Sequence, residues 1–246
     1  MTINFFDFFD NYFDIIIANN DELKNEAYKL RYQVYCVENM FLNPNEYPDK
    51  LESDEFDKNS IQYLVIHRKS GNFIATVRLI LPDSHNPNGL FPLEQHCDIN
   101  KMALSQQINR KNLAEVSRFC ITKTFTRRSF TLGKKQNFPY ITIALINCII
   151  KASHENNIDY LYGIVDHSVI RFASKLGVNF TKIGPQTDYH GIRWPTVIKI
   201  TDAVDYIAEK NQDIWNIITN KGTLIKPPLQ SPIKVSNTLH TQATID

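Results

Sequence analysis

The chain has few cysteines, almost no excess charge and no long apolar run, and each shortage excludes a class of protein. Lys plus Arg number 27 against 26 for Asp plus Glu, so the charge balance gives no indication of nucleic acid as a partner. Four widely spaced cysteines without a CxxC pair argue against zinc and against a disulfide framework, and they fit a reducing cytosol. These cysteines are Cys36, Cys97, Cys120 and Cys148.

The hydrophobic residues are enough for a sizeable core but are not gathered into a membrane span. They make up 43% of the 246 residues, and no apolar run approaches the roughly 20 residues that a span needs. The N-terminal stretch lacks a basic segment and is interrupted by Asp7, Asp10 and Asp14, which is unlike a signal peptide. We therefore expect a cytoplasmic globular protein without internal repeats.

Aromatic residues recur at helical spacing near the N-terminus, among them Phe5, Phe9, Tyr12 and Phe13. The pattern predicts an amphipathic helix in residues 1–20, ahead of the main domain. Three roles are open for its aromatic face: packing on the domain, covering a long apolar ligand, or weak contact with a membrane surface. Acidic residues on the polar face disfavour the membrane role, because such helices usually carry Lys and Arg there.

A second helix is expected from about Glu22 to Val37, with an apolar stripe that ends at Val37. Arg31, Tyr35 and Glu38 lie at i, i+4 and i+7 and share a face beside that stripe. A proline-containing loop and then an acidic cluster follow. The carboxylates of this cluster are either solvated, paired with Arg31, or placed to bind a cationic amine. The two carboxylates singled out are Asp54 and Asp57.

Two strands, 61–68 and 73–81, are predicted to form a hairpin through a four-residue turn. Arg78 lies between Val77 and Leu79 in the second strand, where a guanidinium needs a carboxylate partner or a ligand. Residues 82–113 are irregular and predict a long loop with short helical turns, a kind of segment that often has a function.

The stretch 114–122 predicts a central strand that carries charged residues. Side chains alternate along a strand, so Glu115 and Ser117 should face away from Arg118 unless a bulge brings Glu115 and Arg118 together. Either the two form a structural ion pair, or they belong to a reactive site. Cys120 has no histidine near it in the sequence and is expected in the core.

A basic loop follows this strand and precedes a buried helix from Pro139 to Glu155. Loop amides, the helix N-terminus and four cations predict a phosphate site, although the P-loop spacing is absent. The cations are Arg127, Arg128, Lys134 and Lys135. Later elements are expected as a strand at 160–165, a helix at 168–176, a strand at 178–183, a loop at 184–195, a strand at 196–200, a helix at 205–219 and a disordered tail at 222–246.

This element order, an α/β (α+β) mixed central sheet flanked by helices, resembles the GNAT-like acyl-CoA N-acyltransferase fold. Five motifs in order resemble acyl-homoserine-lactone synthases and, more closely, N-acyl amino acid synthases and acyltransferases associated with PEP-CTERM/exosortase systems. They are Leu30-Arg31-Tyr32-Gln33-Val34-Tyr35, Asp54-Glu55-Phe56-Asp57, Thr76-Val77-Arg78-Leu79, Glu115-Val116-Ser117-Arg118-Phe119 and His190-Gly191-Ile192-Arg193-Trp194-Pro195.

The resemblance implies an acyltransferase domain at 21–221 with no metal and no permanently bound cofactor. Its implied catalytic residues are Glu115, Arg118 and Ser117. Its implied substrate-binding residues are Arg31, Tyr35, Phe41, Asp54, Asp57, Arg78, His190 and Arg193. Its implied contacts with the acyl carrier or phosphopantetheine are Phe119, Ile121, Arg127, Arg128, Lys134 and Lys135.

The function that follows is transfer of a long acyl chain from a carrier thioester to the amine of an amino acid, with Glu115 as a base acting through water. The basic loop lacks the pattern that grips the pyrophosphate of coenzyme A, which favours acyl carrier protein as the donor. Tyr35 and Phe41 stand where homoserine-lactone synthases tend to have Phe and Trp, which disfavours S-adenosylmethionine as the acceptor. The alternatives are an autoinducer synthase that uses S-adenosylmethionine and a non-catalytic acyl-binding module.

Overall fold

The computed structural model describes residues 11–100, 107–123, 125 and 137–225. Its strands form a mixed sheet in the order β1-β2-β3-β4-β5-β8-β6, with β7 paired to β8. β4 and β5 are parallel, and the other neighbours are antiparallel. The strands are β1 (Phe13–Ile17), β2 (Ser60–His67), β3 (Asn72–Ile80), β4 (Leu113–Ile121), β5 (Tyr160–Val165), β6 (Thr181–Lys182), β7 (Thr187–Asp188) and β8 (Ile192–Lys199).

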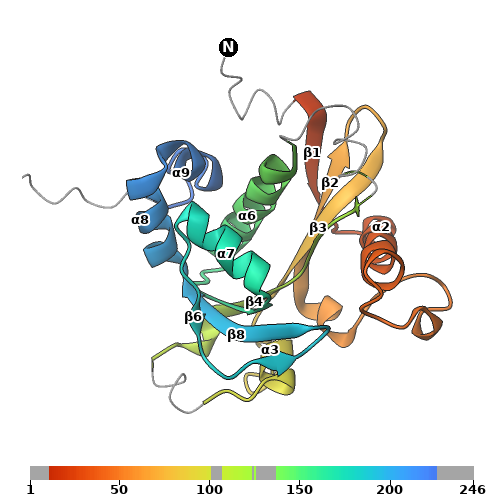
Figure 1. Cartoon of the computed structure of the whole chain (residues 1–246), viewed down its shortest axis with the longest axis horizontal. Helices are drawn as coiled ribbons and strands as arrows, with labels where there is room; N and C mark the ends of the chain where they lie inside the picture. The colour runs from red at the N-terminus through yellow and green to blue at the C-terminus, as the bar shows by residue number, and fades with distance from the viewer. Residues whose placement is uncertain (1–10, 101–106, 124, 126–136, 226–246) are drawn as a thin grey trace, which may run out of the picture.

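Helices cover both faces of this sheet (Figure 1). Alternation along β2 separates the two sides: Tyr63 and Val65 pack in the main core, whereas Leu64 packs under α2. The helices are α2 (Asp21–Tyr32), α3 (Pro92–His96), α6 (Asn137–Glu155), α7 (His167–Leu176), α8 (Ile200–Lys210) and α9 (Gln212–Ile218). Shorter helical turns are η1 (Gln33–Glu38), η2 (Pro44–Glu46), η3 (Glu55–Asn59) and η4 (Arg110–Asn112).

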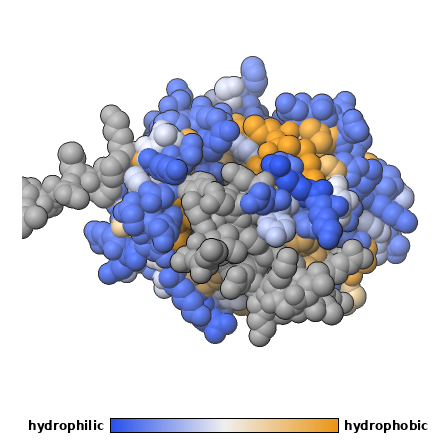
Figure 2. Space-filling model, turned by 90° about the horizontal axis from the view of Figure 1, so that it is seen from above, coloured by the Kyte–Doolittle hydropathy of each residue, from blue (hydrophilic) through white to orange (hydrophobic). Residues whose placement is uncertain are grey.

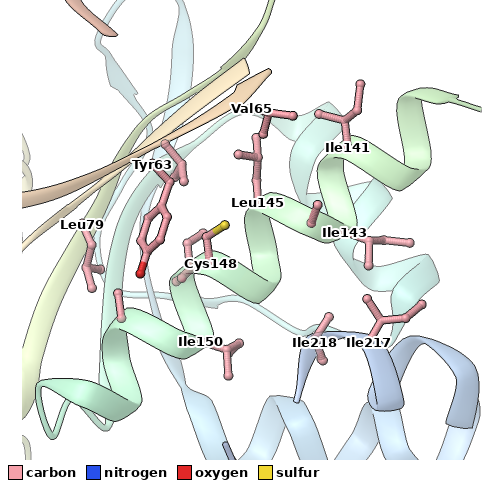
Figure 3. Packing of buried hydrophobic residues seen from close by; sticks show 14 of the residues in the cluster. Tyr63, Val65, Leu79, Ile141, Ile143, Leu145, Cys148, Ile150, Ile217 and Ile218 are labelled. Carbon is pink, nitrogen blue, oxygen red and sulfur yellow. The ribbon is translucent and has the colours of Figure 1, made fainter. Parts of the chain in front are cut away.

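The main core lies between the sheet and α6, as the sequence predicts for a helix that is apolar on most sides. Figure 3 shows Tyr63, Val65 and Leu79 from the sheet facing Leu145 and Cys148 of α6. α9 closes the other side of α6 with Ile217 and Ile218. Core side chains of this size stabilise a fold by roughly 1.5–3 kcal/mol each when fully buried. The core therefore fixes the sheet, and through it the opposite face that carries α2.

The predicted N-terminal helix is wrong over Phe13–Ile17, which form β1. Three consecutive isoleucines, Ile15 to Ile17, favour the extended backbone, and β2 offers a partner along the whole segment. Phe13 and Ile15 pack in the main core, whereas Ile16 packs on the α2 side of the sheet, so the period is two and not 3.6. Residues 1–10, which carry the rest of the predicted helix, lie outside the described residues.

The C-terminal half agrees with the sequence in its order but not at every boundary. β5 and α7 lie where predicted, and Gly177 ends α7 with a left-handed φ of 91°. The predicted strand 178–183 shrinks to β6, and β8 begins at Ile192, inside the predicted loop. The predicted helix 205–219 is two helices, α8 and α9, and residues 226–246 of the predicted tail lie outside the description.

Seen from above the view of Figure 1, the described surface is largely hydrophilic, and a sizeable hydrophobic area stands out on it (Figure 2). Within the described ranges, no helix combines the length and apolar character that crossing a bilayer requires.

Candidate active site

A pocket opens on the α2 face of the sheet, where β4 and β5 separate. The two strands are paired only from Leu113 with Tyr160 to Glu115 with Tyr162. Each strand continues beyond this point without pairing to the other. The empty space in and around the pocket is about 500 Å³, which includes solvent at its open mouth. Its walls are Tyr35, Leu42, Pro92, Glu115, Val116, Ser117, Arg118, Ile164, Tyr189, His190 and Arg193.

A β-bulge in β4 gathers the charged residues of this strand on one side. Thr76 pairs with Cys120 but Arg78 pairs with Ser117, so two residues of β4 stand opposite the single Val77. Arg118 takes a φ of 50°, which a non-glycine residue rarely adopts. The extra residue turns Arg118 to the face that already carries Glu115 and Ser117. The strand therefore has the bulge that the sequence left open, and Glu115 and Arg118 line the same pocket.

The structural ion pair between Glu115 and Arg118 does not form, because Arg118 pairs with other carboxylates. Its Nη2 lies 2.8 Å from Glu52 Oε1 and 3.0 Å from Asp54 Oδ2. Its guanidinium also lies 5.5 Å from the centre of the Tyr35 ring, a cation–π distance. The strained residue at the bulge is thus held by contacts from the 52–54 loop and from the segment after α2.

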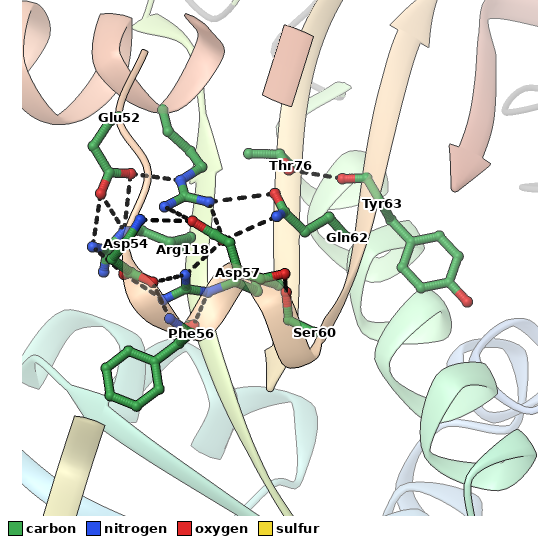
Figure 4. Close-up of polar contacts among 12 residues, drawn as sticks. Glu52, Asp54, Phe56, Asp57, Ser60, Gln62, Tyr63, Thr76 and Arg118 are labelled. Atoms are coloured by element: carbon green, nitrogen blue, oxygen red, sulfur yellow. Dashed lines mark hydrogen bonds and ion pairs between the residues drawn. The ribbon is translucent and has the colours of Figure 1, made fainter. Parts of the chain in front are cut away.

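Arg118 is one of three arginines that share three carboxylates behind the pocket (Figure 4). Arg31 Nε donates to Glu52 Oε2 at 2.5 Å, and its Nη1 donates to Asp57 Oδ1 at 2.7 Å. Arg78 Nη1 donates to Asp54 Oδ1 at 2.5 Å and to Asp57 Oδ1 at 2.7 Å. Two neutral side chains complete the network: Gln62 donates to Asp57, and Arg78 donates to the Ser117 hydroxyl.

This network is buried, and its charges are balanced by contact. The side chains of Arg31 and Glu52 are 0% exposed, and that of Arg78 is 1% exposed. Burial acts to raise the pKa of Glu52, but the guanidiniums of Arg31 and Arg118 outweigh burial and lower that pKa to about 2. Glu52 is therefore ionised at neutral pH. Removing one member would leave a buried charge without its partner.

Arg31 and Arg78, which are predicted to bind substrate, are buried in this network. Neither lines the pocket, and their donors are directed at carboxylates. Asp54 and Asp57 likewise belong to the network and are absent from the pocket wall. These four residues support the pocket from behind, and Arg118 connects them to it.

Glu115 has a different environment from the other carboxylates. It is 2% exposed, and its Oε2 accepts a hydrogen bond from the backbone N–H of Leu93 at 2.9 Å. Burial raises the pKa of Glu115 to about 8, although the Leu93 amide and the Arg78 guanidinium oppose the shift. A carboxyl group in a pocket with a pKa near the working pH is suited to exchange protons with a substrate.

The β7–β8 hairpin covers the pocket with Tyr189, His190 and Arg193. His190 and Gly191 take positive φ values of 54° and 102°, and the tight turn requires this backbone. Burial and the guanidinium of Arg118 lower the pKa of His190, so the imidazole is neutral at pH 7.

Arg193 is the arginine of the pocket wall that has no carboxylate in contact. Its Nη2 donates to the His190 carbonyl at 3.3 Å, and its guanidinium lies 5.5 Å from the centre of the Phe41 ring. Its buried Nε has no hydrogen-bond partner within the described residues. Such a donor is costly unless a ligand or water accepts from it. Arg193 is therefore the cation that the pocket offers to an anionic ligand.

The remaining predicted site residues lie elsewhere or outside the description. Phe41 is partly exposed beside the pocket, with its ring 6.4 Å from that of Tyr35. Phe119 is exposed, and Ile121 packs against the main core. The four cations of the basic loop, Arg127, Arg128, Lys134 and Lys135, lie outside the described residues. Cys120 is buried as predicted, and burial raises the pKa of its thiol to about 12.

Glu52 is the member of the charge network that sequence reasoning missed. It stands at the start of the acidic cluster and joins Arg31 to Arg118. Charge balance could have indicated it, because three arginines in apolar segments require three carboxylates and only two were chosen. In the part of the chain that the structure describes, no group of His, Cys, Asp and Glu side chains could hold a metal ion.

Comparison with known proteins finds a matching domain family and several structures of similar fold. Residues 30–133 match the model of the acetyltransferase (GNAT) domain. A comparison with curated proteins found no significant match. Solved structures that resemble the fold include TofI in a ternary complex with an inhibitor and MTA, at 16% identity and a TM-score of 0.56, covering 80% of this chain and 95% of TofI.

Two further solved structures with a similar fold are synthases. The CoA-dependent acyl-homoserine lactone synthase BjaI, with SAM and isopentyl-CoA, has 15% identity and a TM-score of 0.55, covering 88% of this chain and 92% of BjaI. FeeM, an N-acyl amino acid synthase from uncultured soil microbes, has 19% identity and a TM-score of 0.52, covering 79% and 94%. The domain match and these structures agree with the GNAT-like fold that the sequence predicts.

Proposed function

We propose that the chain transfers a long acyl group from a carrier-bound thioester to the amine of an amino acid. The observation that carries this proposal is that Glu115 and Arg193 line one pocket, the first able to take a proton and the second able to bind a carboxylate. An amino acid presents both groups, an ammonium that must lose a proton and a carboxylate that pairs well with a guanidinium.

In the proposed reaction, ionised Glu115 takes a proton from the ammonium through one water. The neutral amine then attacks the thioester carbon, and the carbonyl oxygen becomes an oxyanion. Backbone N–H groups at the Arg118 bulge are suited to stabilise it, because a bulge turns amides out of the ladder. The C–S bond breaks, the nitrogen loses a second proton, and the thiolate leaves as a protonated thiol.

Direct transfer of this kind requires no enzyme nucleophile. Cys120 is buried with a raised thiol pKa, which agrees with direct attack by the amine. Phosphopantetheine on an acyl carrier protein is the proposed donor, in preference to coenzyme A. The opening between β4 and β5, which begins beyond Glu115, is the route by which an extended thioester arm would reach the pocket.

The experiment that tests this proposal is to express the chain and its Glu115→Gln variant in a bacterial host and compare extracted lipids by mass spectrometry. N-acyl amino acids that are made by the wild type and absent with the variant are expected. If N-acyl homoserine lactones are found in their place, the acceptor is S-adenosylmethionine and not an amino acid.

An assay with purified protein is needed in case the host lacks the substrates, and here both substrates are added. Acyl carrier protein loaded with a long acyl chain is mixed with a panel of amino acids, and thiol release is followed. Release that depends on the amine is expected. Binding of the acyl carrier without any thiol release would identify a non-catalytic module.

A further inference from the structure

Glu115 is held by α3, a segment that comes to the pocket from the irregular stretch between β3 and β4. The backbone N–H of Leu93 donates to Glu115 Oε2 at 2.9 Å, and Pro92 forms part of the pocket wall. α3 has only five residues, so its own hydrogen bonds hold it weakly. Its position must therefore depend on contacts made by its side chains.

A partly buried ion pair between Glu94 and Arg110 supplies these contacts. Glu94 Oε1 lies 2.7 Å from Arg110 Nη1 and Glu94 Oε2 lies 2.8 Å from Arg110 Nη2, a bidentate arrangement. Glu94 Oε2 also accepts from the Phe91 N–H at 2.9 Å and caps α3. The Arg110 guanidinium donates to the Gly89 carbonyl and lies 4.7 Å from the centre of the Phe91 ring. Arg110 thus joins both ends of the turn that presents Leu93 to Glu115.

We infer that Glu94 and Arg110 are a positioning pair that sets the proton affinity and orientation of Glu115. Glu94 places a second carboxylate near Glu115, and Arg110 neutralises its charge. Neither residue lines the pocket, so both act through Glu115. The titratable and charged groups around Glu115 are Arg78 from β3, Glu94 from α3, Cys97 after α3, Arg118 from β4, Tyr162 from β5, and the pocket residues Tyr35, Tyr189, His190 and Arg193.

The two members of the pair have opposite effects on Glu115, which separates this role from simple support of the fold. Glu94→Gln removes a negative charge, keeps an acceptor for the Phe91 amide and leaves Arg110 as an added positive charge. Ionised Glu115 then becomes easier to form. Arg110→Met leaves the Glu94 charge without its partner, and ionised Glu115 becomes harder to form. A residue that only stabilised the fold would shift neither equilibrium.

The role of the pair in catalysis rests on the proposed function, but its effect on the protonation of Glu115 does not. The test therefore first measures the protonation of Glu115 directly. Carbon-13 NMR of the Glu115 carboxyl carbon, assigned by its loss in Glu115→Gln, gives the pKa in the folded protein. We expect Glu94→Gln to lower the pKa of Glu115 and Arg110→Met to raise it, each by on the order of one unit. The double variant should lie between the single variants.

The matched control is Glu26→Gln, which breaks an exposed pair with Lys29 and should leave the Glu115 titration unchanged. An unchanged pKa in Glu94→Gln would overturn the inference, and that variant decides the matter if Arg110→Met does not fold. The pH profile of acyl transfer is then compared with the NMR values. Shifts in the NMR titration without matching shifts in the rate profile would uphold the positioning pair and remove Glu115 from the proposed mechanism.

Discussion

Arg118 and Glu52, 66 residues apart in the sequence, meet behind the pocket with 2.8 Å between Nη2 and Oε1. The contact joins the bulge of β4 to the loop before η3, and Glu52 continues it to Arg31 on α2. One buried carboxylate therefore connects three segments that the chain order separates. The left-handed backbone of Arg118 persists because these contacts hold its side chain.

Glu52→Gln should destabilise the protein by about 3–5 kcal/mol, because the buried guanidinium of Arg31 would lose a charged partner. Urea unfolding followed by circular dichroism measures this change. Glu26→Gln is the matched control, since its pair with Lys29 is exposed and should cost at most about 1 kcal/mol. Equal losses in the two variants would contradict a special role for the network.

The sequence predicts the hairpin, the central strand and the helix at α6, because each depends on local patterns of side chains, and it leaves the bulge open. It does not separate supporting residues from pocket residues. Arg31, Arg78 and Arg193 are alike in type and all are near apolar residues, but only the fold determines which of them meet carboxylates. β1 was missed for a related reason. The segment becomes a strand because it pairs with the edge of β2, and the local sequence does not reveal that this edge is free to pair.

Glu115→Gln should leave the fold intact and lower the rate of acyl transfer at neutral pH by on the order of 100-fold or more. The variant keeps an acceptor for the Leu93 amide but cannot take a proton. Steady-state rates and circular dichroism of the purified variant test this. A folded variant with unchanged activity would show that Glu115 is not the base.

The stability of the wild type relative to Glu115→Gln should fall as the pH rises. The native carboxyl keeps its proton up to a pKa of about 8, whereas an ordinary glutamate loses it near 4.5. Between these values the native state binds one more proton than the unfolded state, so this contribution is complete below about 4.5 and is lost as pH rises to about 8. The difference in unfolding free energy should fall by about 1.4 kcal/mol per pH unit in that window. Urea titrations of both proteins at several pH values measure it, and parallel curves would contradict the raised pKa.

Replacing the basic-loop residues Arg127, Arg128, Lys134 and Lys135 with Ala should weaken use of a carrier-bound donor more than use of a short free thioester. Acyl carrier proteins have acidic surfaces, and contacts between exposed charges are screened beyond roughly 8–10 Å at physiological ionic strength. Initial rates with both donors, at low and high salt, test the prediction. Equal losses on both donors would point to a structural role for the loop.

Arg193→Lys should raise the KM for an amino acid acceptor by on the order of 10- to 100-fold, because a charge-assisted hydrogen bond contributes about 1.5–3 kcal/mol. Lysine keeps the charge but loses the planar fork that matches a carboxylate. The control substrate is the amine with the same side chain and no carboxylate, whose KM should not change. If the KM of both substrates rises equally, Arg193 serves the β7–β8 hairpin through its contacts with His190 and Phe41 and does not bind the acceptor.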